Sequence, residues 1–399
     1  MRIAIFSDNF YPEISGVSDS VISLARELSA RGHNIRFYVP AYSQKDYKKG
    51  GGAAENPPLG PRVEFQRLFS VPYPTPTGQG RAVIPTGFRS VSLRRFNPDV
   101  IHTQLFFGAG IEALIASRIL KKPLVGTNHT ALKEFLKYSP VRAAWVERLA
   151  LRYVNWYYAH CEVITAPSRS VIGEMEFFGF EKETHVISNP IDTKLFAPSA
   201  NKNILRRKFG FPEYTVIHAG RLGEERKVDV IVRAIALAKK KIPAIALAIA
   251  GRGADEARLQ DLAASLDIGN AVHFLGFLDH KTLAEAYNAS SVFAITSTAD
   301  TQSMVMMQAF ACGIPAIGVK SRGIPEYIRP QNGYLIEPDD PNALAEKIIF
   351  LFKNPAMRKK LGHGARVFAE KFSATAIAKE WEMIYKKVVE QYAKKRREA

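Results

Sequence analysis

The sequence is short of cysteine, of acidic residues and of long apolar runs. Its 399 residues include two cysteines, Cys161 and Cys312, both in apolar surroundings, so a disulfide framework is not expected and a reducing setting is favoured. No run reaches the roughly 18 apolar residues of a membrane-spanning helix. The opening residues, MRIAIFSDNF, lack the apolar core of a signal peptide. We therefore expect a cytoplasmic protein that is neither secreted nor inserted across a bilayer.

Acidic residues are outnumbered, 38 against 55 lysines and arginines, which gives a formal net charge of +17. Such an excess favours an anionic partner, whether nucleic acid, nucleotide phosphates or an acidic membrane face. The basic residues are spread through both halves, and the sequence lacks zinc-finger, helix-turn-helix and RNA-binding signatures, so nucleic acid is disfavoured. A generally basic, soluble surface remains the alternative.

Two further chemistries lack their signatures. The sequence contains no Asp-x-Asp cluster and no His/Asp ligand set, so we expect no metal ion and no resident cofactor. Gly251 and Gly253 form a glycine turn, but the third glycine of a dinucleotide fingerprint is missing. A nicotinamide-dependent dehydrogenase is therefore not supported.

Short apolar runs alternate with helical-period segments throughout the chain, a pattern typical of parallel sheets with crossover helices. Between the first two runs, Val17, Val21, Leu24 and Leu28 form one apolar stripe, which predicts a helix that Gly32 ends. The predicted strands of the first half are RIAIFS, NIRFYVP, DVIHTQ, PLVGTNHT, EVITAPS and THVISN. Those of the second half are TVIHAG, IALAIAG, VHFLGF, SVFAIT and PAIGVK.

The alternation breaks twice. Residues 41–80, rich in glycine and proline, predict a long mobile loop with an edge strand, and residues 188–203 predict an interdomain linker. We expect two doubly wound domains, 1–190 and 191–375, with a last helix within 376–399 that crosses back to the first domain. Ligands of such sheets bind beyond the carboxyl ends of the strands, so we expect a cleft between the domains.

Candidate phosphate-binding residues follow two strands. Gly16 and Val17 lead into the first helix, where a glycine allows a phosphate to approach backbone N–H groups. Arg221, Arg226 and Lys227 cluster after the strand TVIHAG and suit a diphosphate. A solvated helix start, salt-bridged through Glu224 and Glu225, explains the same cluster equally well.

Taken together, the segments resemble the family 4 glycosyltransferases, which are retaining enzymes of the GT-B fold. The order and spacing of the motifs carry the resemblance over nearly the whole chain, and the closest likeness is to the diacylglycerol glycosyltransferase subgroup. The motifs are FSDNFYPEISGVSDS, GTNHT, the APS of TAPSRS, NPID, HAGRL, AGRG, VHFLGF, ADTQSMVMMQAFACGIPAIG, GIPEYI and NGYLIEP. The resemblance implies two Rossmann-like domains of doubly wound parallel sheet, facing an interdomain cleft.

The resemblance also implies a site. Gly16 and Val17 approach the donor diphosphate, Arg221 with Arg226 or Lys227 neutralises it, and His129 lies near the reacting sugar. Asp300 and Gln308 stand in the places of two family glutamates, the first associated with the donor sugar and the second with the ribose. The other expected contacts of the nucleotide sugar are Gly220, Gly251, Gly276, Leu278, Ser303, Met304 and Val305.

Four of these positions depart from the family pattern. Asp300 and Gln308 replace glutamates, Ser303 replaces a glycine, and Arg226 replaces a lysine unless Lys227 takes that role. We expect Asp300 and Gln308, eight residues apart, on one side of a helix. Considered without the resemblance, His129 and His102 are more typical of satisfied histidines at strand ends.

The predicted reaction transfers a hexose from a nucleoside-diphosphate sugar, expected to be a UDP-sugar, with retention at the anomeric centre. Residues 130–160 suggest the acceptor, because they carry an apolar stripe beside basic residues. This pattern fits an interfacial helix on an anionic membrane and equally an ordinary amphipathic helix on the sheet. The stripe is Trp145, Leu149, Tyr153 and Trp156, and the basic residues are Lys133, Lys137, Arg142, Arg148 and Arg152.

The subgroup resemblance favours a lipid acceptor such as diacylglycerol and a peripheral protein on the inner face of the cell membrane. Two alternatives stay open: a soluble polysaccharide or small-molecule transferase, and a sugar-nucleotide-binding protein that has lost turnover. The sequence leaves the oligomeric state open.

Overall fold

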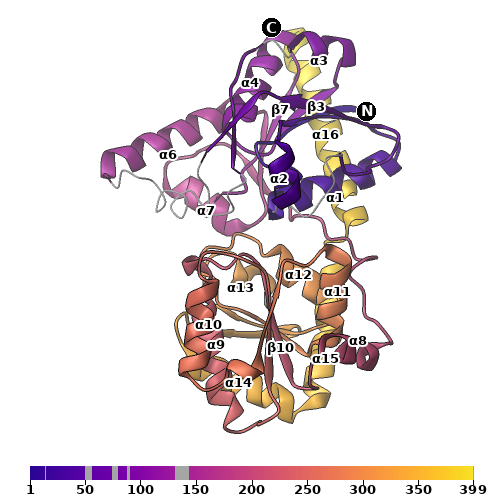
Figure 1. Cartoon of the computed structure of the whole chain (residues 1–399). Coiled ribbons are helices and arrows are strands. Elements are labelled where there is room, and N and C mark those ends of the chain that lie inside the picture. Colours follow the sequence, from indigo (N-terminus) through magenta and orange to yellow (C-terminus); the bar gives the residue numbers. More distant parts are fainter. Residues whose placement is uncertain (14, 50–55, 74–79, 88–89, 131–142, 399) are drawn as a thin grey trace. The chain divides into compact units, whose positions relative to one another are not determined.

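The computed structural model describes residues 1–13, 15–49, 56–73, 80–87, 90–130 and 143–398. The chain divides into two compact units (Figure 1). The first unit combines Met1–Pro190 with Ala374–Ala399, and the second is Ile191–Ser373.

The first unit is built on a seven-stranded sheet in which every neighbouring pair is parallel. The central strands are almost entirely buried and mostly apolar, as expected where helices cover both faces of a parallel sheet. Residues 70–83 add a separate antiparallel pair, β4 (Ser70–Pro72) and β5 (Arg81–Val83). In spatial order the sheet strands are β3 (Val63–Leu68), β2 (Asn34–Pro40), β1 (Arg2–Phe6), β6 (Val100–Thr103), β7 (Leu124–Thr127), β8 (Val163–Ala166) and β9 (Thr184–Val186).

The first helix forms where the apolar stripe predicts it. Ser15 caps its N-terminus, Val21, Leu24 and Leu28 are buried, and Gly32, at φ 93°, follows its end. The helices of the first unit are α1 (Gly16–Ala30), α2 (Gln44–Lys49), α3 (Ser90–Phe96), α4 (Gly108–Leu120), α6 (Ala144–Ala159), α7 (Arg169–Phe177) and α16 (Ala374–Glu398).

The C-terminal helix α16 belongs to the first unit, where it packs against α1 (Figure 1, yellow). Tyr385 on α16 hydrogen-bonds Nδ1 of the buried His102 at 2.7 Å, and the Trp381 ring lies 4.4 Å from the His102 ring. The other ring nitrogen of His102 contacts Thr127 Oγ1 at 2.8 Å. Burial lowers the pKa of His102 to about 3. His102 is therefore a satisfied core histidine, as its place at a strand end suggested.

Residues 41–80 contain more regular structure than the predicted loop. The expected edge strand is β3, at one side of the sheet, whereas α2 was not predicted. Side-chain hydrogen bonds stabilise the first turn of α2, because the backbone N–H and Oγ of Ser43 both donate to Asp46 Oδ2 at 2.8 Å. Residues 50–55 and 74–79 lie outside the described residues.

The second unit contains a six-stranded sheet, again parallel throughout. One edge strand, β15, was not predicted, because it begins with a glycine and its two central residues are only partly buried. The strand order is β12 (Val272–Gly276), β11 (Ala246–Ala250), β10 (Thr215–Ala219), β13 (Val292–Ile295), β14 (Ala316–Val319) and β15 (Gly333–Ile336).

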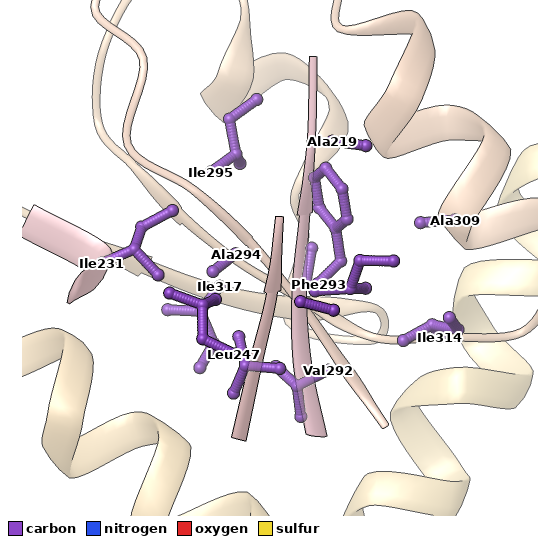
Figure 2. Packing of buried hydrophobic residues seen from close by; sticks show 14 of the residues in the cluster. Ala219, Ile231, Leu247, Val292, Phe293, Ala294, Ile295, Ala309, Ile314 and Ile317 are labelled. Carbon is purple, nitrogen blue, oxygen red and sulfur yellow. The ribbon is translucent and has the colours of Figure 1, made fainter. Parts of the chain in front are cut away.

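Helices cover both faces of this sheet. In Figure 2, Ile231 of α9 and Ala309 of α12 lie on opposite sides of the central strands. Phe293 of β13 belongs to the same buried cluster. The helices are α8 (Lys202–Phe209), α9 (Val228–Lys239), α10 (Glu256–Ser265), α11 (His280–Ala289), α12 (Met304–Ala311), α13 (Ile324–Tyr327), α14 (Pro341–Lys353) and α15 (Pro355–Glu370). Two short 3₁₀ turns are η1 (Glu224–Arg226) and η2 (Gly269–Ala271).

Candidate functional site

In the second unit, most of the predicted donor-site residues gather at the carboxyl ends of the strands. Gly220 follows β10, Gly251 follows β11 and Gly276 ends β12. Gly220 N–H donates to the Ala250 carbonyl at 2.9 Å, and Gly251 N–H donates to the Gly276 carbonyl at 2.8 Å. A Cβ atom on Gly251 would lie 1.8 Å from the Gly220 carbonyl oxygen. Only glycine therefore permits this close approach of the loops.

The basic cluster lies between β10 and α9. Arg221 donates to Glu225 Oε1 at 2.6 Å, and Lys227 Nζ lies 3.3 Å from Asp339 Oδ1. Lys227 adopts left-handed backbone geometry with φ 52°, and Thr296 Oγ1 donates to its carbonyl at 2.7 Å. The helix start is thus salt-bridged through Glu225, while Arg221 and Lys227 are partly exposed.

Arg226, the third cation of the cluster, forms an ion pair with Asp300, which stands in the place of the first family glutamate. Arg226 Nη1 lies 2.5 Å from Asp300 Oδ2 and 3.4 Å from Ser297 Oγ. Burial by itself would raise the pKa of Asp300, but the adjacent Arg226 guanidinium outweighs burial and brings the pKa below its usual range. Asp300 is therefore an ionised, largely buried acceptor.

The prediction that Asp300 and Gln308 share one side of a helix is wrong. Helix α12 begins at Met304, so Asp300 lies on the preceding loop and only Gln308 is helical. The helix starts there because the Ser303 side chain caps it, accepting from Met306 N–H at 3.4 Å. The loop is fixed by Gly323 N–H, which donates to the Asp300 carbonyl at 3.0 Å.

Gln308 is 4% exposed, and its Oε1 has no hydrogen-bond partner among the described residues. The neighbouring Met306 and Met307 are fully buried, as expected for core methionines. Three further residues were predicted to contact the nucleotide sugar. Met304, the first residue of α12, is buried, whereas Val305 and Leu278 are partly exposed.

Sequence reasoning missed His218, the fourth residue of β10. Its Nδ1 contacts the Ala294 carbonyl at 3.0 Å, and its buried Nε2 has no partner among the described residues. Burial, with Arg226 adding to it, lowers the pKa of His218 to about 4, so the imidazole is neutral at pH 7. The available signal was its position, two residues before Gly220 at the end of a strand.

In the first unit, the predicted residues lie on two separate segments, the start of α1 and the loop after β7. Gly16 is exposed at the first turn of α1, and Val17 beside it is half-buried. His129 follows β7 and contacts Gln104 Oε1 through Nε2 at 2.8 Å. Burial lowers the pKa of His129 to about 4, which keeps it neutral at pH 7.

Asp8, at the end of the first strand, was also missed. Its Oδ1 accepts from Ala109 N–H at the start of α4 at 2.8 Å, and its buried Oδ2 has no partner among the described residues. Burial raises the pKa of Asp8 to about 6. Its signal was a carboxylate directly after a buried strand.

Three of the four stripe residues of α6 face outward, whereas Tyr153 is half-buried and its hydroxyl donates to the Phe106 carbonyl at 2.5 Å. Trp145, Leu149 and Trp156 are 64%, 60% and 49% exposed, and Arg148 and Arg152 beside them are exposed too. The helix packs through its other face, formed by Leu151, Val154, Tyr157 and Tyr158. Lys133, Lys137 and Arg142 lie outside the described residues.

No described helix combines the length and apolar character needed to cross a membrane. Over the same parts of the chain, no group of three or more His, Cys, Asp or Glu side chains is placed to hold a metal ion.

Comparison with known proteins connects these features to a family. Residues 14–195 match the family described as Glycosyltransferase Family 4, and residues 201–368 match Glycosyl transferases group 1. A GDP-mannose-dependent alpha-mannosyltransferase of Mycobacterium tuberculosis is 31% identical, over 85% of this chain and 84% of the relative. An alpha-monoglucosyldiacylglycerol synthase of Acholeplasma laidlawii is 25% identical, over 99% of each chain.

Solved structures agree on the fold. Sucrose-phosphate synthase of Thermosynechococcus elongatus superposes with a TM-score of 0.77 at 21% identity, over 97% of this chain and 98% of that structure. HepE of Anabaena gives a TM-score of 0.76 at 19% identity, over 97% and 100%. The chain therefore belongs to glycosyltransferase family 4, whose members are retaining hexosyltransferases of the GT-B fold that use nucleotide sugars.

Proposed function

We propose that this enzyme transfers its hexose to a membrane lipid such as diacylglycerol while bound to an anionic membrane surface. The observation that carries the proposal is the outward face of α6, where Trp145, Leu149 and Trp156 are about half exposed or more beside Arg148 and Arg152. Aromatic and aliphatic side chains flanked by arginines are typical of helices that lie in the membrane interface. Relatives from Acholeplasma laidlawii and Streptococcus pneumoniae bear the name alpha-monoglucosyldiacylglycerol synthase, which supports the choice of acceptor.

The donor diphosphate is proposed to bind Arg221 and Lys227. Both cations are partly exposed and face carboxylates, Glu225 and Asp339, with which an incoming diphosphate competes. The glycine turns after β10 and β11 allow phosphate oxygens to approach the backbone closely. The N-terminus of α12, at Ser303 and Met304, supplies backbone N–H groups. These groups stabilise the negative charge of the departing nucleoside diphosphate.

The sugar and ribose are proposed to bind Asp300 and Gln308. Asp300 is held ionised by Arg226, so it accepts hydrogen bonds from sugar hydroxyls. The buried Oε1 of Gln308 lacks a partner among the described residues, and a ribose hydroxyl would supply one. Because Arg226 is paired with Asp300, we assign the family lysine's role at the diphosphate to Lys227. The roles predicted for Gly16, Val17 and His129 stay predictions.

Flotation with vesicles tests the lipid proposal. The wild-type protein should float with vesicles containing phosphatidylglycerol at low salt, and a smaller fraction of Trp145→Ala/Trp156→Ala should float with them. Met383→Ala is the matched control, because Met383 is 64% exposed on another helix of the same unit. Absence of vesicle binding by the wild type, together with normal transfer to a soluble acceptor, would remove the lipid proposal.

The donor is tested by thermal stabilisation, because a ligand that binds the folded state raises the melting temperature by mass action. UDP-sugars are the expected donors. GDP-mannose is the informative competitor, since one relative is named for its dependence on it. Stabilisation and turnover with GDP-mannose alone would overturn the UDP expectation.

A small-molecule acceptor is the second candidate, because an N-acetyl-alpha-D-glucosaminyl L-malate synthase of Bacillus anthracis matches 94% of this chain at 25% identity. Assays with diacylglycerol in mixed micelles and with soluble acceptors separate the two candidates. The variant Asp300→Glu/Gln308→Glu is assayed in parallel. Transfer by this variant but not by the wild type would indicate that the natural chain binds a sugar nucleotide without turning it over.

A further inference from the structure

A cavity in the second unit lies at the amino ends of the sheet strands, whereas the candidate donor site lies at their carboxyl ends. Its walls include Ser290 and Ser291, directly before β13, and Gly313 to Pro315, directly before β14. The donor-site loops follow the carboxyl ends of the strands, whereas these segments precede the amino ends. With a volume of about 470 Å³, the cavity falls within the size range of small-molecule sites.

The charged residues that line this cavity are all basic. Among the described residues, five that line it are lysines or arginines, and none is an aspartate or glutamate. They come from two helices, α8 and α15: Lys202, Arg206, Arg358, Lys359 and Arg366. Like charges gathered around one hollow repel one another, which favours an anion that neutralises them.

Neighbouring groups neutralise the cluster only in part. Arg366 is engaged, since its Nη1 donates to the carbonyls of Thr193, Phe196 and Ala311 and it pairs with Glu370. Arg358 has a distant partner, Glu213, at 3.9 Å.

Lys202 and Arg206 form no ion pair within the described part of the chain. The one contact of the Arg206 side chain is a long bond of 3.5 Å to Asn203, and its buried Nε has no partner among the described residues. Burial and then the neighbouring Arg206 lower the pKa of Lys202. Burial lowers the pKa of Arg358 as well, and Arg206 again contributes. Lys202, Arg206 and Arg358 line the same cavity, and the positive charge of Arg206 contributes to lowering the pKa of the other two.

Helix ends add to the positive potential. Helix α8 begins at Lys202, helix α15 begins at Pro355, and both residues line the cavity. Within the described part of the chain, no side chain caps either N-terminus with a hydrogen bond. Uncapped helix N-termini favour anions, and here they accompany a cavity and a cation cluster.

We propose that this cavity is a second anion site, which binds the phosphate groups of a small phosphorylated molecule or lipid headgroup through Lys202, Arg206 and Arg358. Arg366 lines the cavity but is not a proposed phosphate ligand, because it is already bound to backbone carbonyls and Glu370. The site is separate from the donor site and does not depend on the proposed acceptor.

Titration of the full-length protein with inorganic pyrophosphate, at constant ionic strength, tests the site. Lys202→Ala/Arg206→Ala should weaken binding at the cavity by about tenfold or more, because hydrogen bonds to charged groups are lost. Arg207→Ala is the matched control, as Arg207 is an exposed arginine of the same helix that does not line the cavity. Arg221→Ala identifies any pyrophosphate bound at the donor site and should leave the cavity binding unchanged.

Melting in phosphate-free buffer shows whether the cavity variant folds. Its melting temperature should equal or exceed that of the wild type, since like charges have been removed, while stabilisation by pyrophosphate should shrink. Should the double variant fail to fold, Lys202→Gln alone is titrated. Pyrophosphate binding that is unchanged in the folded cavity variant, absent from the wild type, or lost only in Arg221→Ala overturns the proposal.

Flotation then distinguishes the two sources of phosphate. Binding to phosphatidic acid vesicles in excess of binding to phosphatidylglycerol vesicles is measured in the Trp145→Ala/Trp156→Ala background, so that α6 does not dominate the result. Vesicle binding lost in the same variant that loses pyrophosphate assigns a lipid headgroup. Vesicle binding retained by that variant assigns a dissolved phosphorylated molecule.

Discussion

The ion pair between Arg226 and Asp300 determines the protonation state of a buried carboxylate. At 2.5 Å, the guanidinium offsets the burial that would otherwise raise the pKa of Asp300. Stability from this lowered pKa is present above the carboxyl's unfolded-state pKa and is lost as the pH falls through the folded value. Without Arg226, burial raises the pKa of Asp300, and a charged Asp300 then destabilises the fold near neutral pH.

Arg226→Gln should therefore shift the acid limb of the pH–rate profile to higher pH. The measurement is kcat/KM against pH, together with the pH dependence of unfolding. Arg226→Lys, which keeps a positive charge, should shift the profile less. Arg221→Gln is the control, because Arg221 pairs with Glu225 instead. Identical acid limbs in the wild type and Arg226→Gln would show that the pair does not set the pKa of Asp300.

Gly251 tests whether the close approach of two loops is needed. Gly251→Ala would place a Cβ 1.8 Å from the Gly220 carbonyl oxygen at φ 154°, so the loops must separate. We expect a loss of stability of about 1–3 kcal/mol and a smaller rise in melting temperature on adding UDP. Gly269→Ala is the matched control, since a Cβ there meets no atom within 4 Å. Equal donor stabilisation in both variants would contradict the proposed phosphate contacts.

Much of the candidate donor site could be located from the sequence because its residues follow predicted strands. Gly220 is hydrogen-bonded to Ala250 and Gly251 to Gly276, as expected for loops at the carboxyl ends of neighbouring parallel strands. The Arg226–Asp300 pair could not be predicted, because its partners lie on different loops and meet only through the fold. The buried His218 escaped for a similar reason, since its surroundings come from neighbouring strands and loops.

Helix α16 is held to the first unit by an ion pair at one of its turns. Glu382 accepts from Arg31 Nε at 2.9 Å and from Arg31 Nη2 at 2.6 Å, and it contacts His33 Nε2 at 2.7 Å. These contacts, with Arg31 foremost, lower the pKa of Glu382 to about 2 from an ordinary value of 4.5. The stabilisation is therefore complete above pH 4.5 and lost as the pH falls towards 2.

Glu382→Gln should lower the free energy of unfolding of the first unit by about 1 kcal/mol near pH 7, the upper part of the range for partly exposed pairs. The difference from the wild type should shrink between pH 4.5 and pH 2. Glu390→Gln on the same helix serves as the control, because Glu390 forms no ion pair in the described structure. A difference between wild type and Glu382→Gln that stayed constant down to pH 2 would be inconsistent with the pair as its source.

Elements were predictable where burial gives the sequence a pattern. Strands such as β1 and β11 are continuous apolar runs because helices cover both faces of their sheets. The edge strand β15 escaped because two of its four residues, Tyr334 and Leu335, are only partly buried. Asp300 was misplaced onto a helix because periodicity alone does not reveal that Ser303 caps α12.

At the scale of the molecule, two cores share one chain. The first unit has its own core cluster, which includes Phe6 and Tyr158, and the second unit has another, which includes Phe293 and Phe310. The chain leaves the first unit at Pro190 and returns at Ala374. Within the second unit, Ile191 N–H donates to the Phe372 carbonyl at 2.8 Å, so the two segments that cross between units begin side by side. A ligand bound to either unit should therefore stabilise chiefly that unit's core.

The net charge of +17 makes a prediction about the whole molecule on a membrane. Long-range attraction to anionic vesicles should weaken steeply as salt rises, because the screening length falls from about 10 Å at 0.1 M to about 3 Å at 1 M. The exposed Trp145 and Trp156 should leave a remainder that salt does not remove, since burial of apolar surface is not screened.

Flotation across a salt series separates the two contributions. Arg148→Gln/Arg152→Gln should reduce the salt-sensitive part, and Trp145→Ala/Trp156→Ala should abolish the salt-resistant part. Arg233→Gln/Lys239→Gln on α9 removes the same charge from the second unit and is the matched control for the local effect. If it lowers binding as much as the α6 arginine variant does, the attraction comes from net charge alone. Helix α6 would then have no special role in electrostatic binding, and the membrane-facing assignment would rest on its tryptophans.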